Sequence, residues 1–468
     1  MPAPGGGELA IVLHSHQPYV AGFGTWPFGE EWLWESIATS YLPLLDVLEH
    51  GAPVTLSLTP VLCDQLEEPG AMARCAAFLA TTRVETHRRD IAAAVAARDA
   101  GVVAALEHSA ARYEWARARL AALEGAGGLP AALGRHAAWT SAATHAILPL
   151  LATDHGVRLQ LRAGIDAHRA RFGADWGGGL WLPECAYAPG LDERLVEAGV
   201  RAVCVDLTDV LAPAAHLRPL QPDAGPRLVP IDRATIELVW GRAGYPSDPR
   251  YRSYHAFTAH RHRAWSNDGT AYDPARGAAA AREHGADFVR RVRERVAGGG
   301  LCVLAIDTEL LGDWWHEGPL WLEAVLGEAA EQGLAIARLD EALARHPPAP
   351  APAAAELPVT TWGTPRDLTT WSAPPVADMA SSARDAELRT VAAARAGAAD
   401  ERAVRELLAL QSSDWAFLVS TDIAAPYGRE RAAGHRAALD AALAAPGAHE
   451  PALRNLAPHA TASALRVP

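Results

Sequence analysis

Two acidic side chains follow short apolar runs in positions suited to acid, base or nucleophilic chemistry. Glu184 lies in the stretch GLWLPECAY, and Asp307 closes the run LCVLAID. A third apolar run, ELAIVLH, ends in His14, and His16 follows two residues later. In parallel α/β folds the side chains at the carboxyl ends of the strands converge on the ligand site. We therefore expect two carboxyl groups and two histidines to face one cleft.

Structural roles and metal binding are also open to these residues. An acidic residue after a strand is commonly a helix cap or an ion-pair partner, and Glu184 and Asp307 could each be one. A His-x-His pair at a strand end, here His14 and His16, is also typical of metal ligands in amidohydrolase-like barrels and carbohydrate deacetylases. From the residues alone, a carboxylate mechanism and a metal site both stay open.

Short apolar runs indicate the buried strands that would position these side chains. They cover residues 8–14, 54–60, 201–207 and 301–307. Long segments rich in Ala, Glu and Arg with helical spacing lie between them. This alternation predicts an α/β fold with a parallel sheet or barrel. Residues from about 83 to 135 carry no strand signal and are expected to form a helical insertion, packed as a hairpin.

The chain is expected to divide into two domains. Residues 346–358 are rich in Pro and Ala, which cannot maintain helical hydrogen bonds, and are predicted to be a linker or an extended strap. Residues 1–345 would form the catalytic barrel. Residues 359–468 would form a C-terminal domain, which is expected to be helical because its sequence carries a helical pattern almost throughout.

Composition excludes several classes of protein. The 468 residues are 50% hydrophobic and 21% charged, as in an ordinary globular chain. A formal net charge of -13 argues against a nucleic-acid partner, and the N-terminus has neither the basic region nor the apolar length of a signal or membrane segment. Five widely spaced cysteines indicate a reducing compartment. We expect a cytoplasmic protein with no membrane or nucleic-acid partner.

Tryptophan is unusually frequent in the chain. There are 15 Trp residues against 9 Tyr and 7 Phe. Large flat side chains fill hydrophobic cores, and they are also the surfaces on which sugar rings stack. Composition alone does not choose between these roles.

Six ordered motifs resemble those of glycoside hydrolase family 57, and most closely the 1,4-α-glucan branching enzymes within it. The likeness covers nearly the whole chain. The matching segments, in chain order, are LHSHQPYV, the pair EEWLWESIATSYLPLL and LSLTPVLCDQL, ATHAILPLL, GLWLPECAYAPGLDE, AIDTELLGDWWHEGPLW and ERAVRELLALQSSDWAFLV.

This resemblance implies a distorted (β/α)7 barrel that acts on α-1,4-linked glucan without a metal or cofactor. It assigns Glu184 as the nucleophile and Asp307 as the acid/base of a retaining mechanism, which needs two carboxyl groups roughly 5 Å apart. An aspartic acid that donates a proton near neutral pH needs a raised pKa. Burial beside Trp314 and Trp315, together with the charge of Glu184, would raise it.

The resemblance also implies further site residues. In branching enzymes a loop tyrosine shields the covalent intermediate from water, and Tyr245 is the candidate here, with Tyr251 and Tyr254 close by in the sequence. The remaining candidates are expected to bind the glucan as hydrogen-bonding or stacking side chains. They are His14, His16, Gln17, Trp26, Trp32, His145, Trp181, Trp314, Trp315, Trp362 and Trp415.

Two departures from the family pattern bear on activity. Ala137 stands where the family has a glutamate, so a polar sugar contact is expected to be missing, and Trp139 is a candidate to replace it by stacking. The segment between the Tyr245 loop and Asp307 is short and has no evident strand. Four hypotheses stay open: a branching enzyme, a hydrolase or 4-α-glucanotransferase of the same family, a weakly active or degenerate glucan-binding protein, and a metal-dependent deacetylase.

Overall fold

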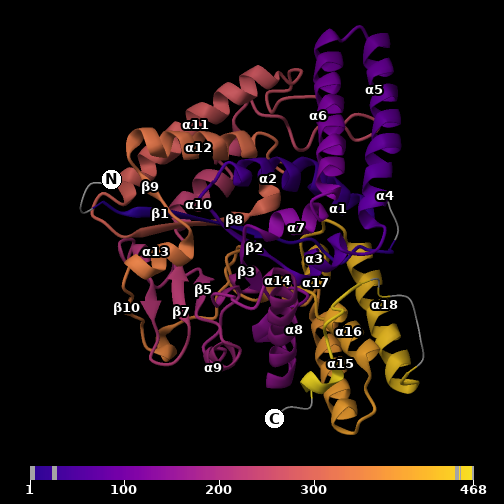
Figure 1. Cartoon of the computed structure of the whole chain (residues 1–468), viewed down its shortest axis with the longest axis vertical. Helices are drawn as coiled ribbons and strands as arrows, with labels where there is room; N and C mark the ends of the chain where they lie inside the picture. The colour runs from indigo at the N-terminus through magenta and orange to yellow at the C-terminus, as the bar shows by residue number, and fades with distance from the viewer. Residues whose placement is uncertain (1–5, 24–28, 448–452, 454, 466–468) are drawn as a thin grey trace.

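A curled, mainly parallel sheet forms the centre of the molecule (Figure 1). The computed structural model describes residues 6–23, 29–447, 453 and 455–465. The strands are β1 (Glu8–Ser15), β2 (Thr55–Leu58), β3 (Ala137–Ser141), β4 (Gly179–Trp181), β5 (Ala202–Val205), β6 (Leu220–Gln221), β7 (Arg227–Pro230), β8 (Leu301–Asp307), β9 (Ala335–Ile336) and β10 (Ala349–Pro350). Strands β1 and β8 are continuous apolar runs because helices cover both faces of the sheet.

Seven strands of the described chain run parallel in the order β7, β5, β4, β3, β2, β1, β8. The short strand β6 pairs antiparallel with β7, and β9 adds to β1. Just beyond β7, the backbone N–H of Asp232 donates to the carbonyl of Val303 in β8 at 2.8 Å, so the two ends of the sheet approach each other. This curled parallel arrangement confirms the predicted α/β class.

Helices enclose the sheet. Those packed around it are α1 (Glu30–Ser36), α2 (Leu42–Glu49), α3 (Pro60–Leu66), α4 (Ala71–Phe78), α8 (Asp154–Phe172), α9 (Asp192–Glu197), α10 (Arg233–Trp240), α11 (Pro274–Arg295), α12 (Gly318–Gln332) and α13 (Leu339–Arg345). Residues 231–300, all of which the structure describes, contain no strand, in agreement with the sequence. Among the described helices, none is long and apolar enough to cross a membrane.

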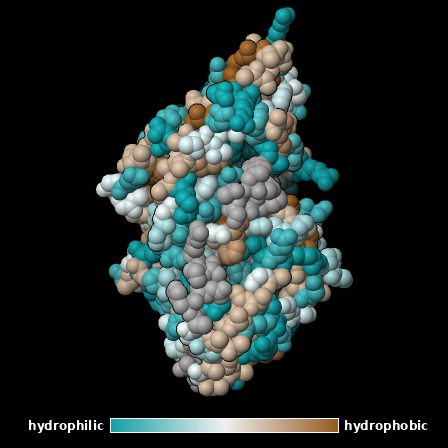
Figure 2. Space-filling view, turned by 90° about the vertical axis from the view of Figure 1, so that its right-hand side faces the viewer, coloured by the Kyte–Doolittle hydropathy of each residue, from teal (hydrophilic) through white to brown (hydrophobic). Residues whose placement is uncertain are grey.

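The segment expected to be a helical insertion forms three helices. They are α5 (Val84–Ala96), α6 (Ala100–Glu124) and α7 (Gly128–Gly134). Helices α5 and α6 lie antiparallel as a hairpin that projects from the body, and Figure 2 shows this projection as a narrow end with a mixed polar and apolar surface (Figures 1 and 2). Asp99 caps α6, because its side chain accepts a hydrogen bond from the backbone of Val102 at 3.0 Å.

The chain after α13 first follows the sheet and then forms a helical unit. Strand β10 lies in the Pro/Ala-rich segment and pairs with β6, so this part runs as a strap along the sheet edge. The helical unit contains α14 (Thr369–Ser372), α15 (Ala377–Arg395), α16 (Glu401–Leu410), α17 (Ser413–Ser420) and α18 (Ala425–Ala444). Its core is shared with the barrel, because Tyr19, Val61 and Leu159 pack in the same apolar cluster as Leu407 and Leu439.

All five cysteines are buried and carry free thiols. They belong to the barrel part of the chain. Cys63 lies in α3, Cys75 in α4, Cys204 in β5 and Cys302 in β8, while Cys185 follows Glu184 directly. Burial raises the pKa of the Cys63 and Cys75 thiols to about 12.

Candidate active site

The predicted carboxyl groups and histidines meet at the carboxyl ends of the strands. His14 and Asp307 are register partners on the neighbouring strands β1 and β8. Glu184 lies three residues after the end of β4, in the short helical turn Pro183–Cys185. Parallel pairing carries these strand ends to one edge of the sheet, which is why residues so far apart in sequence share a site.

Glu184 has an unusual backbone conformation. Its φ of 59° lies in the left-handed region, which a residue with a side chain occupies only when its surroundings require it. The turn is held by a hydrogen bond from the backbone N–H of Cys185 to the carbonyl of Leu182 at 2.8 Å. The Glu184 side chain is 20% exposed.

Trp362, which follows the strap, fixes Glu184 at two points. The indole Nε1–H donates to Glu184 Oε2 at 2.9 Å, and the backbone N–H of Trp362 donates to the Glu184 carbonyl at 3.0 Å. The Trp362 ring also meets Trp181 edge-on, with centroids 4.9 Å apart. Trp362 was predicted to stack on sugar, and the structure gives it a direct contact with the carboxyl group instead.

Three histidines form a stacked group beside the carboxyl groups. The Nε2 atoms of His14 and His145 lie 3.0 Å apart, and the rings of His16 and His145 stack with centroids 4.0 Å apart. His145 comes from a turn after β3 where its φ is 58°. Its Nδ1 lies 3.9 Å from Glu184 Oε1, so this group reaches the predicted nucleophile.

Ring nitrogens of His14 and His16 also form hydrogen bonds with other protein side chains. His14 Nδ1 lies 3.3 Å from Ser57 Oγ, and His16 Nε2 lies 2.9 Å from Asp414 Oδ1. Within the part of the chain that the structure describes, no three His, Cys, Asp or Glu side chains are grouped so that they could hold a metal ion. The His-x-His pair is therefore engaged in a hydrogen-bonded network.

The three rings differ in charge. Burial, with the neighbouring histidines, lowers the pKa of His14 and of His145 well below the ordinary value. Burial also lowers the pKa of His16, but Asp414 outweighs this effect and the net shift is upward. His16, at one end of the group, is therefore the ring that most readily takes a proton, and His145 lies between it and His14.

The pKa values of the two carboxyl groups are raised to different extents. Burial, followed by the charges of Glu309 and Glu184, raises the pKa of Asp307 well above its ordinary value. Burial also raises the pKa of Glu184, but the hydrogen bond from Trp362 and the charge of His16 counter that effect. Glu184 therefore has stabilising partners for its ionised form, whereas Asp307 is surrounded by like charge and keeps its proton to higher pH.

Glu309 is a third carboxyl group in the site, which the sequence did not single out. It accepts hydrogen bonds from the backbone N–H of His16 at 3.1 Å and from the hydroxyl of Tyr41. Burial raises the pKa of Glu309 to about 7, against the hydrogen bond from Tyr41. In the sequence, the feature that could have identified Glu309 is its position two residues after Asp307, in an otherwise apolar segment.

The C-terminal helical unit completes the site through α17. Asp414 binds His16, and Ser413 Oγ lies 3.0 Å from His145 Nδ1. Trp415, the predicted stacking residue of this segment, is 1% exposed, and its Nε1–H donates to the carbonyl of Ala409 at 2.7 Å. The prediction of Trp415 as a sugar contact is wrong, because its ring belongs to the core of the helical unit.

Two more predicted stacking residues are also fully enclosed. Trp181 is 0% exposed and stacks on His14 at 4.6 Å, and Trp315 is 1% exposed and packs against Tyr251. Neither presents a face to a ligand, so both predictions are corrected to supporting roles. Trp26 lies outside the described residues.

Trp314 and Trp32 line an open cavity beside the site, with a volume of about 270 Å³. Trp314 is 39% exposed and stacks on Tyr254 with centroids 4.7 Å apart. Gln17 links this cavity to the strand ends, because its Nε2 donates to Ser36 Oγ at 2.9 Å and Ser36 in turn lies 3.4 Å from Asp313.

The loop tyrosine nearest this cavity is not the predicted one. Tyr245 is anchored on α11, where its hydroxyl donates to Asp287 Oδ2 at 2.8 Å and its ring stacks on His284. Tyr254 lies nine residues later and lines the cavity together with Trp314. The structure therefore does not bring Tyr245 to the carboxyl groups.

Ala137 lies at the wrong end of its strand for a sugar contact. It begins β3, whereas Ser141 ends that strand on the side of the site, roughly 13 Å away at the usual rise per residue. Trp139 is 0% exposed, and its Nε1–H donates to Asp340 at 3.0 Å. The predicted loss of a sugar contact at Ala137 and the compensating role of Trp139 are both wrong.

The sheet is curled and parallel, and ionisable side chains gather at the carboxyl ends of its strands. This arrangement is that of a barrel enzyme whose ligand site lies at that end of the barrel. Residues 134–352 match the sequence model of glycosyl hydrolase family 57, and residues 376–458 match the C-terminal domain of 1,4-α-glucan branching enzyme. The chain belongs to glycosyl hydrolase family 57.

Relatives cover nearly the whole chain. A probable 1,4-α-glucan branching enzyme of Mycobacterium tuberculosis is 33% identical over 508 residues, which cover 92% of this chain and 91% of the relative. The crystal structure of a family 57-type branching enzyme from Pyrococcus horikoshii has a TM-score of 0.83 at 29% identity, over 92% of this chain and 88% of that one. An α-amylase from Thermotoga maritima shares the fold, with a TM-score of 0.80 at 22% identity over 99% of both chains.

Proposed function

We propose that this protein is a 1,4-α-glucan branching enzyme, which cleaves an α-1,4 bond and transfers the released chain to a 6-hydroxyl group of another glucan. One observation carries the proposal. The helical unit that matches the branching-enzyme C-terminal domain supplies Asp414 and Ser413 to the histidine group beside Glu184. The part of the chain typical of branching enzymes is thus built into the site.

In the first step, Glu184 attacks the anomeric carbon and Asp307 donates its proton to the leaving glycosidic oxygen. The C–O bond to the leaving glucan breaks as the bond to the Glu184 carboxylate forms, and a glycosyl ester results. The raised pKa of Asp307 keeps its proton available, and the Trp362 hydrogen bond favours ionised Glu184.

In the second step, Asp307 is ionised and accepts the proton of an acceptor 6-hydroxyl group. The acceptor oxygen forms a bond to the anomeric carbon, the ester bond to Glu184 breaks, and both carboxyl groups return to their starting state. Two displacements retain the α-configuration. His16, whose pKa Asp414 raises, opposes excess negative charge among the carboxyl groups when it is protonated.

Branching requires a glucan rather than water to reach the ester. We assign the acceptor to the cavity lined by Trp32, Tyr254 and Trp314, since the exposed ring of Trp314, backed by Tyr254, suits the apolar faces of sugar rings. A glucan bound over this stack would cover the mouth of the barrel and displace water from it. Tyr254 takes the shielding role that the sequence gave to Tyr245.

The experiment is incubation of the purified chain with amylose, followed by debranching and chain-length profiling. New α-1,6 branches support the proposal. New reducing ends without branches would indicate a hydrolase, and redistributed linear chains would indicate a 4-α-glucanotransferase. Glucan binding without any product would indicate a binding protein.

A further inference from the structure

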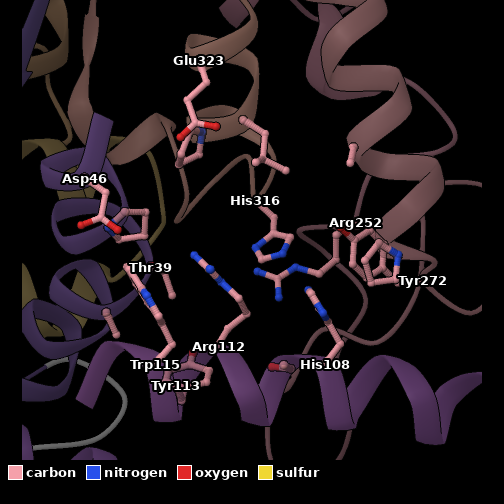
Figure 3. Close-up of a pocket in the computed structure, with 17 residues that line it drawn as sticks. Thr39, Asp46, His108, Arg112, Tyr113, Trp115, Arg252, Tyr272, His316 and Glu323 are labelled. Carbon is pink, nitrogen blue, oxygen red and sulfur yellow. The ribbon is translucent and has the colours of Figure 1, made fainter. Parts of the chain in front are cut away.

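A second cavity, with a volume of about 400 Å³, lies between α2, α6, α12 and the loop before α11 (Figure 3). Its wall contains Arg112 and His108 of α6, together with Arg252 and His316. No residue of the Glu184 and Asp307 cluster lines it. A volume of this size is typical of small-molecule sites.

Two guanidinium groups converge on this space. Figure 3 shows Arg112 and Arg252 directed toward its middle, together with the ring of His316. The Nε of Arg252 is buried and has no hydrogen-bond acceptor within the described part of the chain. Arg112 lies over the ring of Trp115 at 4.5 Å, a contact that leaves its N–H groups free to donate.

Three carboxylates lie near these two guanidinium groups. Glu317 accepts from the backbone N–H of Arg252 at 3.1 Å, and Asp46 pairs with Arg119 at 2.9 Å. Glu323 lies at the rim of the cavity in Figure 3. Asp46 and Glu323 act on the charge of Arg112, and Glu317 acts on that of Arg252. Among the described residues, however, neither guanidinium group forms a hydrogen bond or an ion pair with a carboxylate.

The histidines there are expected to be neutral. Burial, followed by the charges of Arg252 and Arg112, lowers the pKa of His316 well below its ordinary value. Burial, followed by Arg112, also lowers the pKa of His108. Burial also outweighs the nearby carboxylates and lowers the pKa of both Arg112 and Arg252, so a bound anion would stabilise their charged forms.

We propose that this cavity binds a small phosphorylated molecule, with its phosphate group between Arg112 and Arg252. Guanidinium groups recognise phosphate through paired N–H donors, and here two approach from different elements. The space exceeds that of a phosphate ion, and its remaining wall offers the hydroxyl groups of Thr39, Ser109 and Tyr272. That lining suits a sugar, so a hexose phosphate is the expected class.

The test is isothermal titration of the full chain with glucose 6-phosphate, inorganic phosphate and glucose. Glucose 6-phosphate should bind at one site per chain and more tightly than inorganic phosphate, and glucose should not bind there. Arg252→Gln and Arg112→Gln should each weaken glucose 6-phosphate binding by about tenfold or more. Arg117→Gln is the matched control, since Arg117 lies on the same helix and pairs with Glu114 on the surface.

Several outcomes would overturn the proposal. Glucose binding as tightly as glucose 6-phosphate would identify a neutral sugar site. Equal binding of sulfate and phosphate that neither arginine variant alters would mean an adventitious ion only. Equal affinity for inorganic phosphate and glucose 6-phosphate, lost in both variants, would keep the phosphate site but overturn the hexose class. Arg112 lies on α6 and forms no hydrogen bond or ion pair within the described chain, so Arg112→Gln keeps the test decisive if Arg252→Gln unfolds.

Discussion

At the scale of single residues, the site separates two carboxyl groups by their surroundings. Glu184 receives an indole hydrogen bond and lies near an imidazolium, whereas Asp307 lies near the carboxyl groups of Glu309 and Glu184. The first environment favours a carboxylate, and the second favours a carboxylic acid. Two similar side chains therefore take opposite roles in the proposed reaction.

Glu184→Gln and Asp307→Asn should each lower turnover on amylose by about a thousandfold or more, because each removes one half of a double displacement. Initial rates of branch formation measure the loss, and circular dichroism checks the fold. Glu193→Gln, an exposed neighbour of Glu184 in sequence, should behave like the wild type. Activity near the wild-type level in either catalytic variant would remove that residue from the mechanism.

Glu309→Gln should shift the alkaline limb of the kcat/KM profile to lower pH. The Glu309 carboxylate raises the pKa of Asp307, so its removal lowers that pKa, and the acid proton is lost at lower pH. The glutamine oxygen still accepts from Tyr41 and the His16 backbone. An unmoved limb would mean that Glu309 does not affect the proton of Asp307.

At the scale of elements, Tyr245 and Tyr254 lie in the same loop between α10 and α11 but have distinct surroundings. Tyr254→Ala should lower branch formation more than bond cleavage, because it removes half of the stacked pair with Trp314 that we assign to the acceptor. Tyr245→Ala should lower both rates equally or only stability, since its hydroxyl binds α11. The ratio of branches to new reducing ends measures the effect. The reverse pattern would return the shielding role to Tyr245.

The segment between β8 and α12 depends on one glycine. Gly312 has a φ of 110°, and a Cβ there would lie 1.9 Å from the backbone oxygen of Thr39. Gly312→Ala should therefore lower the free energy of unfolding by about 3 kcal/mol or more and displace the neighbouring Asp313 and Trp314.

Gly327→Ala in α12 is the control for that substitution. A Cβ there meets nothing within 4 Å, so the helix should gain about 1 kcal/mol. Denaturant unfolding measures both variants. A Gly312→Ala chain as stable as the wild type would show that this backbone contact can relax.

At the scale of the whole molecule, the barrel and the C-terminal helices are expected to unfold together. Leu407 is 0% exposed in the apolar cluster that also contains Tyr19 and Leu159 of the barrel part. Leu407→Ala should lower the stability of both parts, by about 2 to 5 kcal/mol. Calorimetry should give one transition at a lower temperature, whereas exposed Leu388→Ala should leave it unchanged. Two separated transitions would contradict a shared core.

Local pattern was sufficient to predict the strand ends. The runs ending at His14 and Asp307 are continuously apolar, and parallel pairing then places their ends together whatever the loops contain. Glu184 was predicted by the same reasoning. Its left-handed backbone was not, because nothing in Pro-Glu-Cys requires that conformation without the Trp362 contact.

The remaining site residues depend on contacts between distant segments. Asp414 lies 398 residues from His16, and no local pattern distinguishes it from any other acidic residue near a helix start. Trp415 was predicted from its motif position, but a motif position does not say whether a large ring faces a ligand or fills a core. Ala137 was misplaced for a related reason, since a motif position does not say which end of a strand it occupies.

The buried thiols can be used to detect local opening of the barrel. All five cysteines are enclosed and belong to the barrel part, and burial raises the pKa of the Cys63 and Cys75 thiols to about 12. An alkylating reagent can therefore react with these two only when the chain around them opens and the thiolate forms. Pulsed alkylation followed by mass spectrometry would measure the rate of opening at each cysteine. Alkylation of Cys185 would report transient opening of the turn that contains Glu184.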